Sequence, residues 1–208
     1  MEAYACLSTR FVARHLNPPL RGRSKDCFAP FGPPHLSNVR QHKPLIAVSA
    51  ASSLRLARQE DAAAVKACVV AAFGRYVVRI GKPPAPMLLD FAAEIRAGHV
   101  WLVPDKATGV AGVLVQYETR EGFYIDTVAV LPDSQGIGVG KALLQFAEQE
   151  ALRRGYTSVY LCTNAKMTEN QTFYPRIGYV ERERKRESGY ARIFYVKSLV
   201  GTQDQGAA

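Results

Sequence analysis

From about residue 53 onward, hydrophobic and polar residues recur at regular spacings, and no such pattern precedes that point. The acidic pair Glu60 and Asp61 favours the start of a helix. Apolar residues then recur at spacings of three and four, which predicts a helix with one buried face. The positions of that face are Val65, Cys68, Val69, Ala72, Phe73 and Tyr76.

Runs of β-branched and aromatic residues, separated by glycine, proline and turn residues, predict seven strands. Three further helices are expected at 86–97, at 138–154 and after Thr168. Thr168 and Gln171 have the spacing of a capping box for the last helix, and Pro175 predicts a bent or broken turn within it. The predicted strands cover residues 54–57, 99–104, 110–119, 123–130, 158–163, 179–187 and 190–199.

The strand at 123–130 organises the predicted fold. It is joined to the strand at 158–163 by a glycine loop and a helix, and a connection of this length is a right-handed crossover between parallel strands. The strands at 179–187 and 190–199 form a hairpin around Ser188-Gly189. The alternating charges at 181–187 indicate that the first of these is a solvated edge strand.

The loop between the parallel strands has the chemistry of an anion site. Gly136, Gly138 and Gly140 let the backbone approach a ligand, and the following helix directs unpaired N–H groups at it. The P-loop pattern fails, because Gln135 stands where its first glycine is needed and Ala142 follows Lys141. The dinucleotide pattern G-x-G-x-x-G also fails in either register.

The pattern that fits is Q-x-x-G-x-G from Gln135 to Gly140, followed by N-x-x-x-F-Y-P-R-I-G-Y from Asn170 to Tyr179. Both motifs, together with the element order β-α-α-β-β-β-α-β-α-β-β, resemble the GNAT acetyltransferases over about residues 54–199. The resemblance implies an α+β fold with three α/β/α layers. Its sheet is mixed, mostly antiparallel and seven-stranded, with about four helices and a splayed parallel strand pair.

The resemblance also implies an acetyl-coenzyme A site and no metal. Backbone groups of Val128 and Val130 would bind the pantetheine arm, and Asn170 matches a family position that contacts it. Gln135 stands where the family often has arginine, which weakens charge pairing but leaves the amide cradle. The pyrophosphate would be held around Gln135, Gly136, Gly138, Val139, Gly140 and Lys141.

Two residues are the candidates for catalysis. Tyr174 matches the family tyrosine that protonates the departing thiolate, although core packing alone would explain a tyrosine next to Phe173. Asp126 is the candidate base that deprotonates the acceptor amine, on the same strand face as Tyr124 and Val128. Tyr124 occupies the position of a catalytic glutamate in many relatives, so Asp126 also fits a structural role.

The implied reaction is acetyl transfer to a primary amine of a small molecule or peptide, by direct attack in a ternary complex. A catalytically weak acyl-coenzyme A sensor of the same fold is the alternative. The acceptor site is nominally lined by Arg75, Tyr76, Arg79 and Asp90, whose charges also suit an ordinary helix surface. We expect a monomer or homodimer with no nucleic acid or membrane partner.

Residues 1–52 form a basic, proline-rich leader that we expect to be disordered, before a GNAT domain at 53–199 and a polar tail at 200–208. Residues 1–55 hold eight of the 27 Lys and Arg against only Glu2 and Asp26, so much of the chain's +9 charge lies there. An organellar transit peptide, a start codon placed too early and a plain flexible extension all fit. We therefore expect a cytoplasmic protein, or a mitochondrial or plastid one if the leader directs import. The four cysteines have no metal-ligand spacing.

Overall fold

A computed structural model describes residues 54–200, so the predictions for the leader and for nearly all of the tail lie outside the described residues. Seven strands and four α-helices are present, as expected, and each strand lies within two residues of its predicted bounds. Short 3-10 turns precede α2, α3 and α4. The elements are β1 Arg55–Leu56, α2 Ala62–Ile80, α3 Phe91–Arg96, β2 Val100–Asp105, β3 Gly109–Thr119, β4 Gly122–Val130, α4 Val139–Arg153, β5 Ser158–Asn164, α5 Thr168–Arg176, β6 Val180–Glu187 and β7 Tyr190–Ser198.

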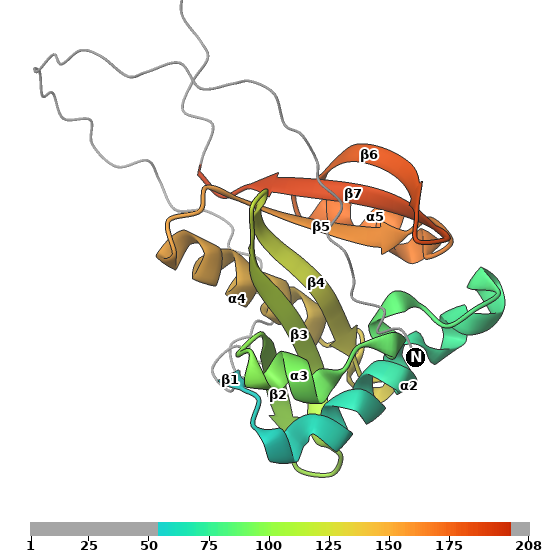
Figure 1. Ribbon diagram of the computed structural model, residues 1–208, viewed down its shortest axis with the longest axis vertical. Helices are drawn as coiled ribbons and strands as arrows, with labels where there is room; N and C mark the ends of the chain where they lie inside the picture. The colour runs from blue at the N-terminus through green and yellow to red at the C-terminus, as the bar shows by residue number, and fades with distance from the viewer. Residues whose placement is uncertain (1–53, 201–208) are drawn as a thin grey trace, which may run out of the picture. The chain divides into compact units, whose positions relative to one another are not determined.

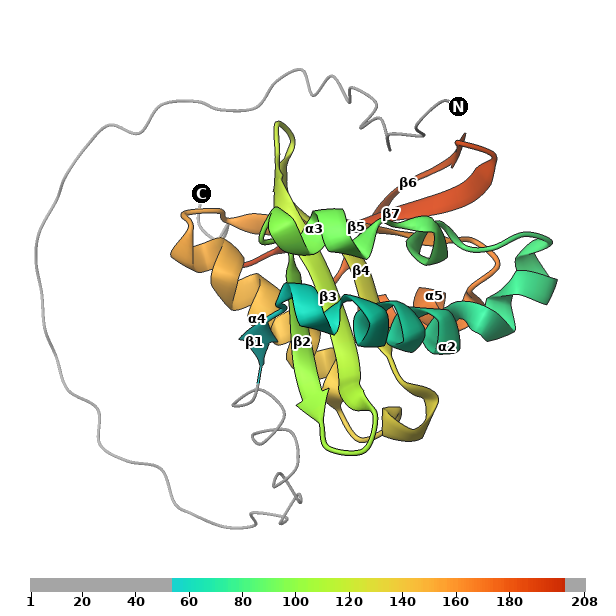
Figure 2. The same cartoon turned by 60° about the horizontal axis from the view of Figure 1, so that its bottom comes forward.

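The strands form one mixed sheet in the order β1-β2-β3-β4-β5-β7-β6. All neighbours are antiparallel except β4 and β5, which are parallel, so the predicted fold class is confirmed. Helix α4 lies on one face of the sheet, and α2 and α3 lie on the other (Figures 1 and 2). Each face buries its own apolar cluster, and burial on both faces is what holds the three layers together.

The edges of the sheet are short or charged. Strand β1 has two residues, and β6 at the opposite edge carries alternating acidic and basic side chains with Val180 as its exposed apolar residue. The hairpin between β6 and β7 turns at Ser188 and Gly189, whose φ angles of 51° and 74° are both positive. Positive φ at two central residues is typical of a tight hairpin turn. The predicted solvated edge strand is therefore present.

The structure differs from three local predictions. The helix expected at 86–97 is divided, because Asp90 accepts a hydrogen bond from the Ala93 N–H at 3.0 Å and begins α3 afresh. The capping box at Thr168 is absent: Gln171 instead donates to the Ala165 carbonyl at 2.8 Å, and residue 167 is the N-cap. Helix α5 also continues through Pro175 and ends one residue later, so no break precedes the proline.

Helix α4 approaches the sheet most closely over Gly112 in β3. A Cβ atom added there would lie 2.9 Å from Val139 Cγ1 and 3.1 Å from Leu143 Cδ1. Both distances are tighter than ordinary carbon contacts. The first turn of α4, and with it the end of the glycine loop, therefore rests directly on a residue without a side chain.

We expect Gly112→Ala to destabilise the protein by about 1–3 kcal/mol, because the added methyl group overpacks the contact with α4. Gly74→Ala in the middle of α2 is the control, since a Cβ there meets no atom within 4 Å. That change should stabilise the helix by about 0.5–1 kcal/mol. Urea unfolding measures both. Equal stabilities for the two variants would show that α4 can move away from the sheet at no cost.

Candidate functional site

The sheet opens between its two parallel strands. Strands β4 and β5 are paired at only three positions, and the pairing ends at Ile125 opposite Leu161. Asp126 is the next residue, and it has no partner on β3 either, because Val115 pairs with Thr127 and the following β3 residue pairs with Ile125. Asp126 is thus the extra residue of a β-bulge, a feature that bends its strand. The two strands diverge beyond this point (Figure 1).

Beyond the divergence, the backbone groups of β4 have no partner strand on the side toward β5. The Leu131 N–H donates to the Ala111 carbonyl on β3 at 2.9 Å. Because hydrogen-bonded and non-hydrogen-bonded pairs alternate in an antiparallel ladder, Val128 and Val130 direct their N–H and C=O groups away from β3. These groups point toward the gap beside β5, where the family resemblance predicts the pantetheine arm of the cofactor.

The glycine loop follows directly at the end of β4. The Gln135 side chain donates to the Val130 carbonyl at 3.0 Å and so fixes the entry to the loop. Gly136 and Gly138 have φ angles of 76° and 95°, which only glycine adopts without strain. Gly138 is the N-cap of α4 and offers no side chain to its first amides. Those amides are therefore available to an anion.

The remaining loop residues differ in what they can offer. A Cβ at Gly136 would meet no atom within 4 Å, so a ligand has free approach to the backbone there. Val139 buries its side chain in the core and has only its amide to contribute. A Cβ added at Gly140 would lie 3.5 Å from Val130 Cγ2, and Lys141 is exposed on the first turn of α4. These residues fit a pyrophosphate held by amides with a lysine nearby.

Asn170 lies on the opposite side of the gap. Its Nδ2 donates to Thr163 Oγ1 at 2.7 Å, which ties the first turn of α5 to the end of β5. Thr163 itself is buried. Asn170 is thereby held beside the free edge of β5, across from Val128 and Val130.

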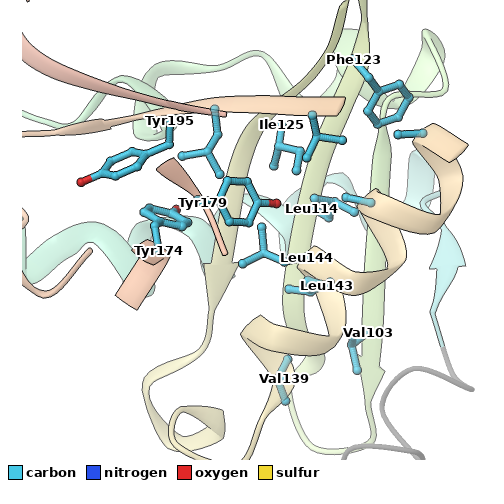
Figure 3. Packing of buried hydrophobic residues seen from close by; sticks show 14 of the residues in the cluster. Val103, Leu114, Phe123, Ile125, Val139, Leu143, Leu144, Tyr174, Tyr179 and Tyr195 are labelled. Carbon is cyan, nitrogen blue, oxygen red and sulfur yellow. The ribbon is translucent and has the colours of Figure 1, made fainter. Parts of the chain in front are cut away.

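Tyr174 is buried among aromatic rings beneath the sheet (Figure 3). Its ring centroid lies 5.6 Å from that of Tyr179 and 5.4 Å from that of Tyr195. Within residues 54–200 no hydrogen bond is made to its hydroxyl. Burial raises the pKa of Tyr174 above its ordinary value, and the nearby Cys162 adds to this effect. The hydroxyl therefore keeps its proton at neutral pH.

Asp126 lies where the strands diverge. It accepts hydrogen bonds from Thr127 Oγ1 at 2.9 Å and from the Tyr117 hydroxyl at 3.4 Å. Burial raises the pKa of Asp126, the negative charge of Glu94 raises it further, and the positive charge of Arg192 opposes both. A carboxylate with a raised pKa is a stronger proton acceptor, as a general base requires.

The expectation that Asp126 and Val128 share a strand face is wrong. Tyr117, which contacts both Tyr124 and Asp126, packs on the cluster beneath α2, whereas Val128 packs on the cluster beneath α4. The bulge is the reason, because its extra residue reverses the alternation of side chains beyond it. Tyr124 and Asp126 remain on one face, toward α2 and α3.

Sequence patterns missed three residues of that face. Cys162 on β5 lies 3.2 Å from the Tyr124 hydroxyl and accepts from Arg192 Nη1 at 3.0 Å. Tyr117 on β3 supports Asp126. Tyr117 and Cys162 lie in strands whose sequences are typical of ordinary buried strands. Arg192 lies in a hairpin with many charged residues. No local sequence signal therefore distinguished these three residues. Their strand positions become informative only when the sheet order is known.

The four residues expected to line the acceptor site make different contacts. The hydroxyl of Tyr76 accepts from Arg75 at 2.8 Å, while Arg79 forms a 2.7 Å ion pair with Glu169 that joins α2 to α5. Asp90 caps α3 and is occupied by that task. Tyr76 is near enough to Tyr174 to affect its pKa, so the end of α2 lies beside this tyrosine.

Two further findings concern residues 54–200. No three His, Cys, Asp or Glu side chains in this range gather in a way that could hold a metal ion. None of its helices has the length and apolar character needed to cross a membrane.

Taken together, the site has an amide cradle for an anion, a strand edge open to an extended ligand, a protonated tyrosine on one side and a carboxylate of raised pKa on the other. This set of groups suits acyl transfer from a phosphate-bearing thioester. It holds both a proton donor for a leaving group and an acceptor for the proton of a nucleophile.

Comparisons with known proteins agree with this geometry. An N-acetyltransferase of Thermoplasma acidophilum, solved in complex with coenzyme A, has a TM-score of 0.58 at 12% identity, over 70% of this chain and 97% of that one. A GCN5-related N-acetyltransferase of Rhodopseudomonas palustris has a TM-score of 0.57 at 23% identity, over 70% and 94%. A GNAT acetyltransferase of Staphylococcus aureus has 0.59 at 14%, over 71% and 98%.

A search of curated protein sequences finds no match. Structural likeness at these identities shows the fold alone. The family model described as "Acetyltransferase (GNAT) family" matches residues 69–179, which is more than half of the chain and includes both motifs. The chain therefore belongs to the GNAT acetyltransferase family.

Proposed function

We propose that the protein transfers the acetyl group of acetyl-coenzyme A to a primary amine of a small molecule or peptide, by direct attack in a ternary complex. The observation that carries this proposal is the divergence of β4 from β5 at Asp126, with the amide cradle at one end. That arrangement offers one extended ligand both a strand edge and an anion site. Family membership supports the same assignment.

These residues divide the reaction between two faces of the sheet. The amides at the start of α4 would bind the pyrophosphate of acetyl-coenzyme A, and Val128 and Val130 would bind its arm through their backbone groups. Asp126 would take a proton from the acceptor ammonium, directly or through water, because only a neutral amine attacks a thioester. Tyr174 would give its proton to the departing thiolate.

A catalytically weak acyl-coenzyme A sensor is the second candidate. The observation that favours it is Tyr124, which stands where many relatives carry a glutamate and donates to or accepts from Cys162. A sensor would bind acetyl-coenzyme A without releasing thiol. Incubation with a panel of amines, amino acids and peptides, followed by measurement of free thiol, separates the two functions.

Substitution of two matched glycines tests whether the backbone amides of the glycine loop bind the cofactor. Gly136 and Gly155 both have positive φ, and a Cβ at either meets no protein atom within 4 Å, so alanine causes similar backbone strain at both. Acetyl-coenzyme A at a hundred times its Kd should stabilise the wild type and Gly155→Ala by about 2.7 kcal/mol. Gly136→Ala should lose most of this gain in a thermal-shift assay. A response to NAD or ATP but not to acetyl-coenzyme A would contradict the proposal.

Tyr174→Phe keeps the ring and removes the proton donor, so turnover should fall on the order of 10²-fold or more while acetyl-coenzyme A affinity stays the same. The control is Tyr179→Phe in the same aromatic cluster. The Tyr179 hydroxyl donates to Glu148 Oε1 at 3.0 Å, so its loss should lower stability and leave turnover in place. If Tyr174→Phe turns over at the wild-type rate but unfolds more readily, Tyr174 is a packing residue.

Asp126→Asn should slow turnover and raise stability at neutral pH. The folded-state pKa of Asp126 lies above its unfolded value, so the native state binds more protons between the two and its stability falls as pH rises through that window. Asparagine removes the buried charge that causes this loss. Turnover should fall most at low pH, where few acceptor amines are neutral. A loss of melting temperature at pH 7 would instead identify Asp126 as a structural carboxylate.

A further inference from the structure

The face of the sheet that carries Asp126 is lined by aromatic rings from three neighbouring strands and from His99, which directly precedes β2. The ring centroids of His99 and Tyr117 are 5.0 Å apart, those of Tyr117 and Tyr124 are 5.6 Å apart, and those of Tyr124 and Tyr160 are 4.8 Å apart. These four side chains, which we call the aromatic ladder, run from the start of β2 to β5. All four keep part of their surface exposed, and their rings are tilted against one another, so the ladder offers aromatic faces and edges to a ligand.

Arg192 lies at the far end of the ladder, on β7. The neighbouring Ile193 points into the core with α4, so Arg192 points to the opposite face, the one that holds Tyr124 and Asp126. Its Nη1 donates to Cys162, whose sulfur also contacts the Tyr124 hydroxyl. Its side chain is only 15% exposed.

The hydrogen bonds of this arginine are incomplete. Its Nε is buried and has no hydrogen-bond partner among residues 54–200. Glu187 Oε2 lies 3.6 Å from Nε and forms an ion pair with the guanidinium, but this distance is too long for a hydrogen bond. Buried polar groups are normally satisfied, and guanidinium groups bind carboxylates with particular strength. An arginine held this way in a site is suited to an anionic group that arrives with a ligand.

The two charges of the site have opposite signs and lie on opposite arms of the open sheet. Asp126 is on β4 and Arg192 on β7, and a series of contacts through Tyr117, Tyr124 and Cys162 connects them. Asp126, Arg192 and the aromatic ladder would respectively bind the ammonium group, the adjacent carboxylate and the apolar ring of one ligand. We propose that the acceptor is an α-amino acid with an aromatic side chain, whose carboxylate is bound by Arg192.

This inference rests on the proposed function, and matched acceptors test it. Phenylalanine and phenethylamine differ only in the carboxylate, and phenylalanine and alanine differ only in the ring. With acetyl-coenzyme A and the full chain, kcat/KM for phenylalanine should exceed that for each of the others by about tenfold or more. Equal values for phenylalanine and phenethylamine would overturn the role of Arg192, and equal values for phenylalanine and alanine would overturn that of the ladder.

Substitution of Arg192 tests whether this residue causes the preference for an acceptor with a carboxylate. Arg192→Gln should reduce the ratio of kcat/KM for phenylalanine over phenethylamine by about tenfold, since a charge-assisted hydrogen bond is lost only with the acid. Arg186→Gln on the exposed edge strand β6 is the control and should leave the ratio unchanged. Arg192→Lys keeps the positive charge but cannot bind a carboxylate through two parallel N–H groups. It replaces the glutamine variant if that variant does not fold. An unchanged ratio in a folded Arg192 variant would overturn the proposal.

The same experiment separates this inference from the function it rests on. If no amine of any kind releases thiol, although acetyl-coenzyme A binds, the transferase proposal fails and the acceptor inference fails with it. If aliphatic amines release thiol as readily as phenylalanine does, the transferase stands and only the acceptor inference is overturned.

Discussion

The end of hydrogen bonding between β4 and β5 is the constraint on which the rest of the site depends. Two parallel strands that paired along their whole length would close the sheet and leave no free backbone beside Val128 and Val130. The bulge at Asp126 prevents this, because it bends β4 away after three paired positions. The same bulge places a carboxylate at the point of divergence. One irregular residue thus both opens the gap and puts a carboxylate beside it.

The helices secure this opening from both faces. Helix α4 rests on Gly112 and brings its N-terminus to the end of β4, while α5 is tied to β5 through Asn170 and Thr163. The Arg79–Glu169 ion pair joins α2 to α5 across the divergence, but both side chains are about half exposed, so the pair adds little to stability. The apolar cluster under α4, which contains residues of β3, β4, β5 and β7, therefore does most to hold the two halves together.

Much of this arrangement could be predicted from the sequence. The element order, the parallel pair and the loop at Gly136–Gly140 followed from periodicity, crossover length and glycine spacing, because these are local signals. The bulge did not, since it arises from an offset between two strands and leaves no mark in either one. That is why Asp126 and Val128 were assigned to the same face. Arg192 was missed for a related reason: its neighbours come from β4 and β5, far away in the sequence.

The charged outer strand has a consequence for assembly. Strand β6 exposes a backbone edge, but its alternating Arg, Lys and Glu side chains would meet the same charges on a second copy laid alongside it. The opposite edge is a strand of two residues, too short to pair stably with another. Copies of this chain are therefore poorly able to join their sheets into a continuous one. Within residues 54–200, the surfaces left for a dimer are those of the helices and loops rather than the edges of the sheet.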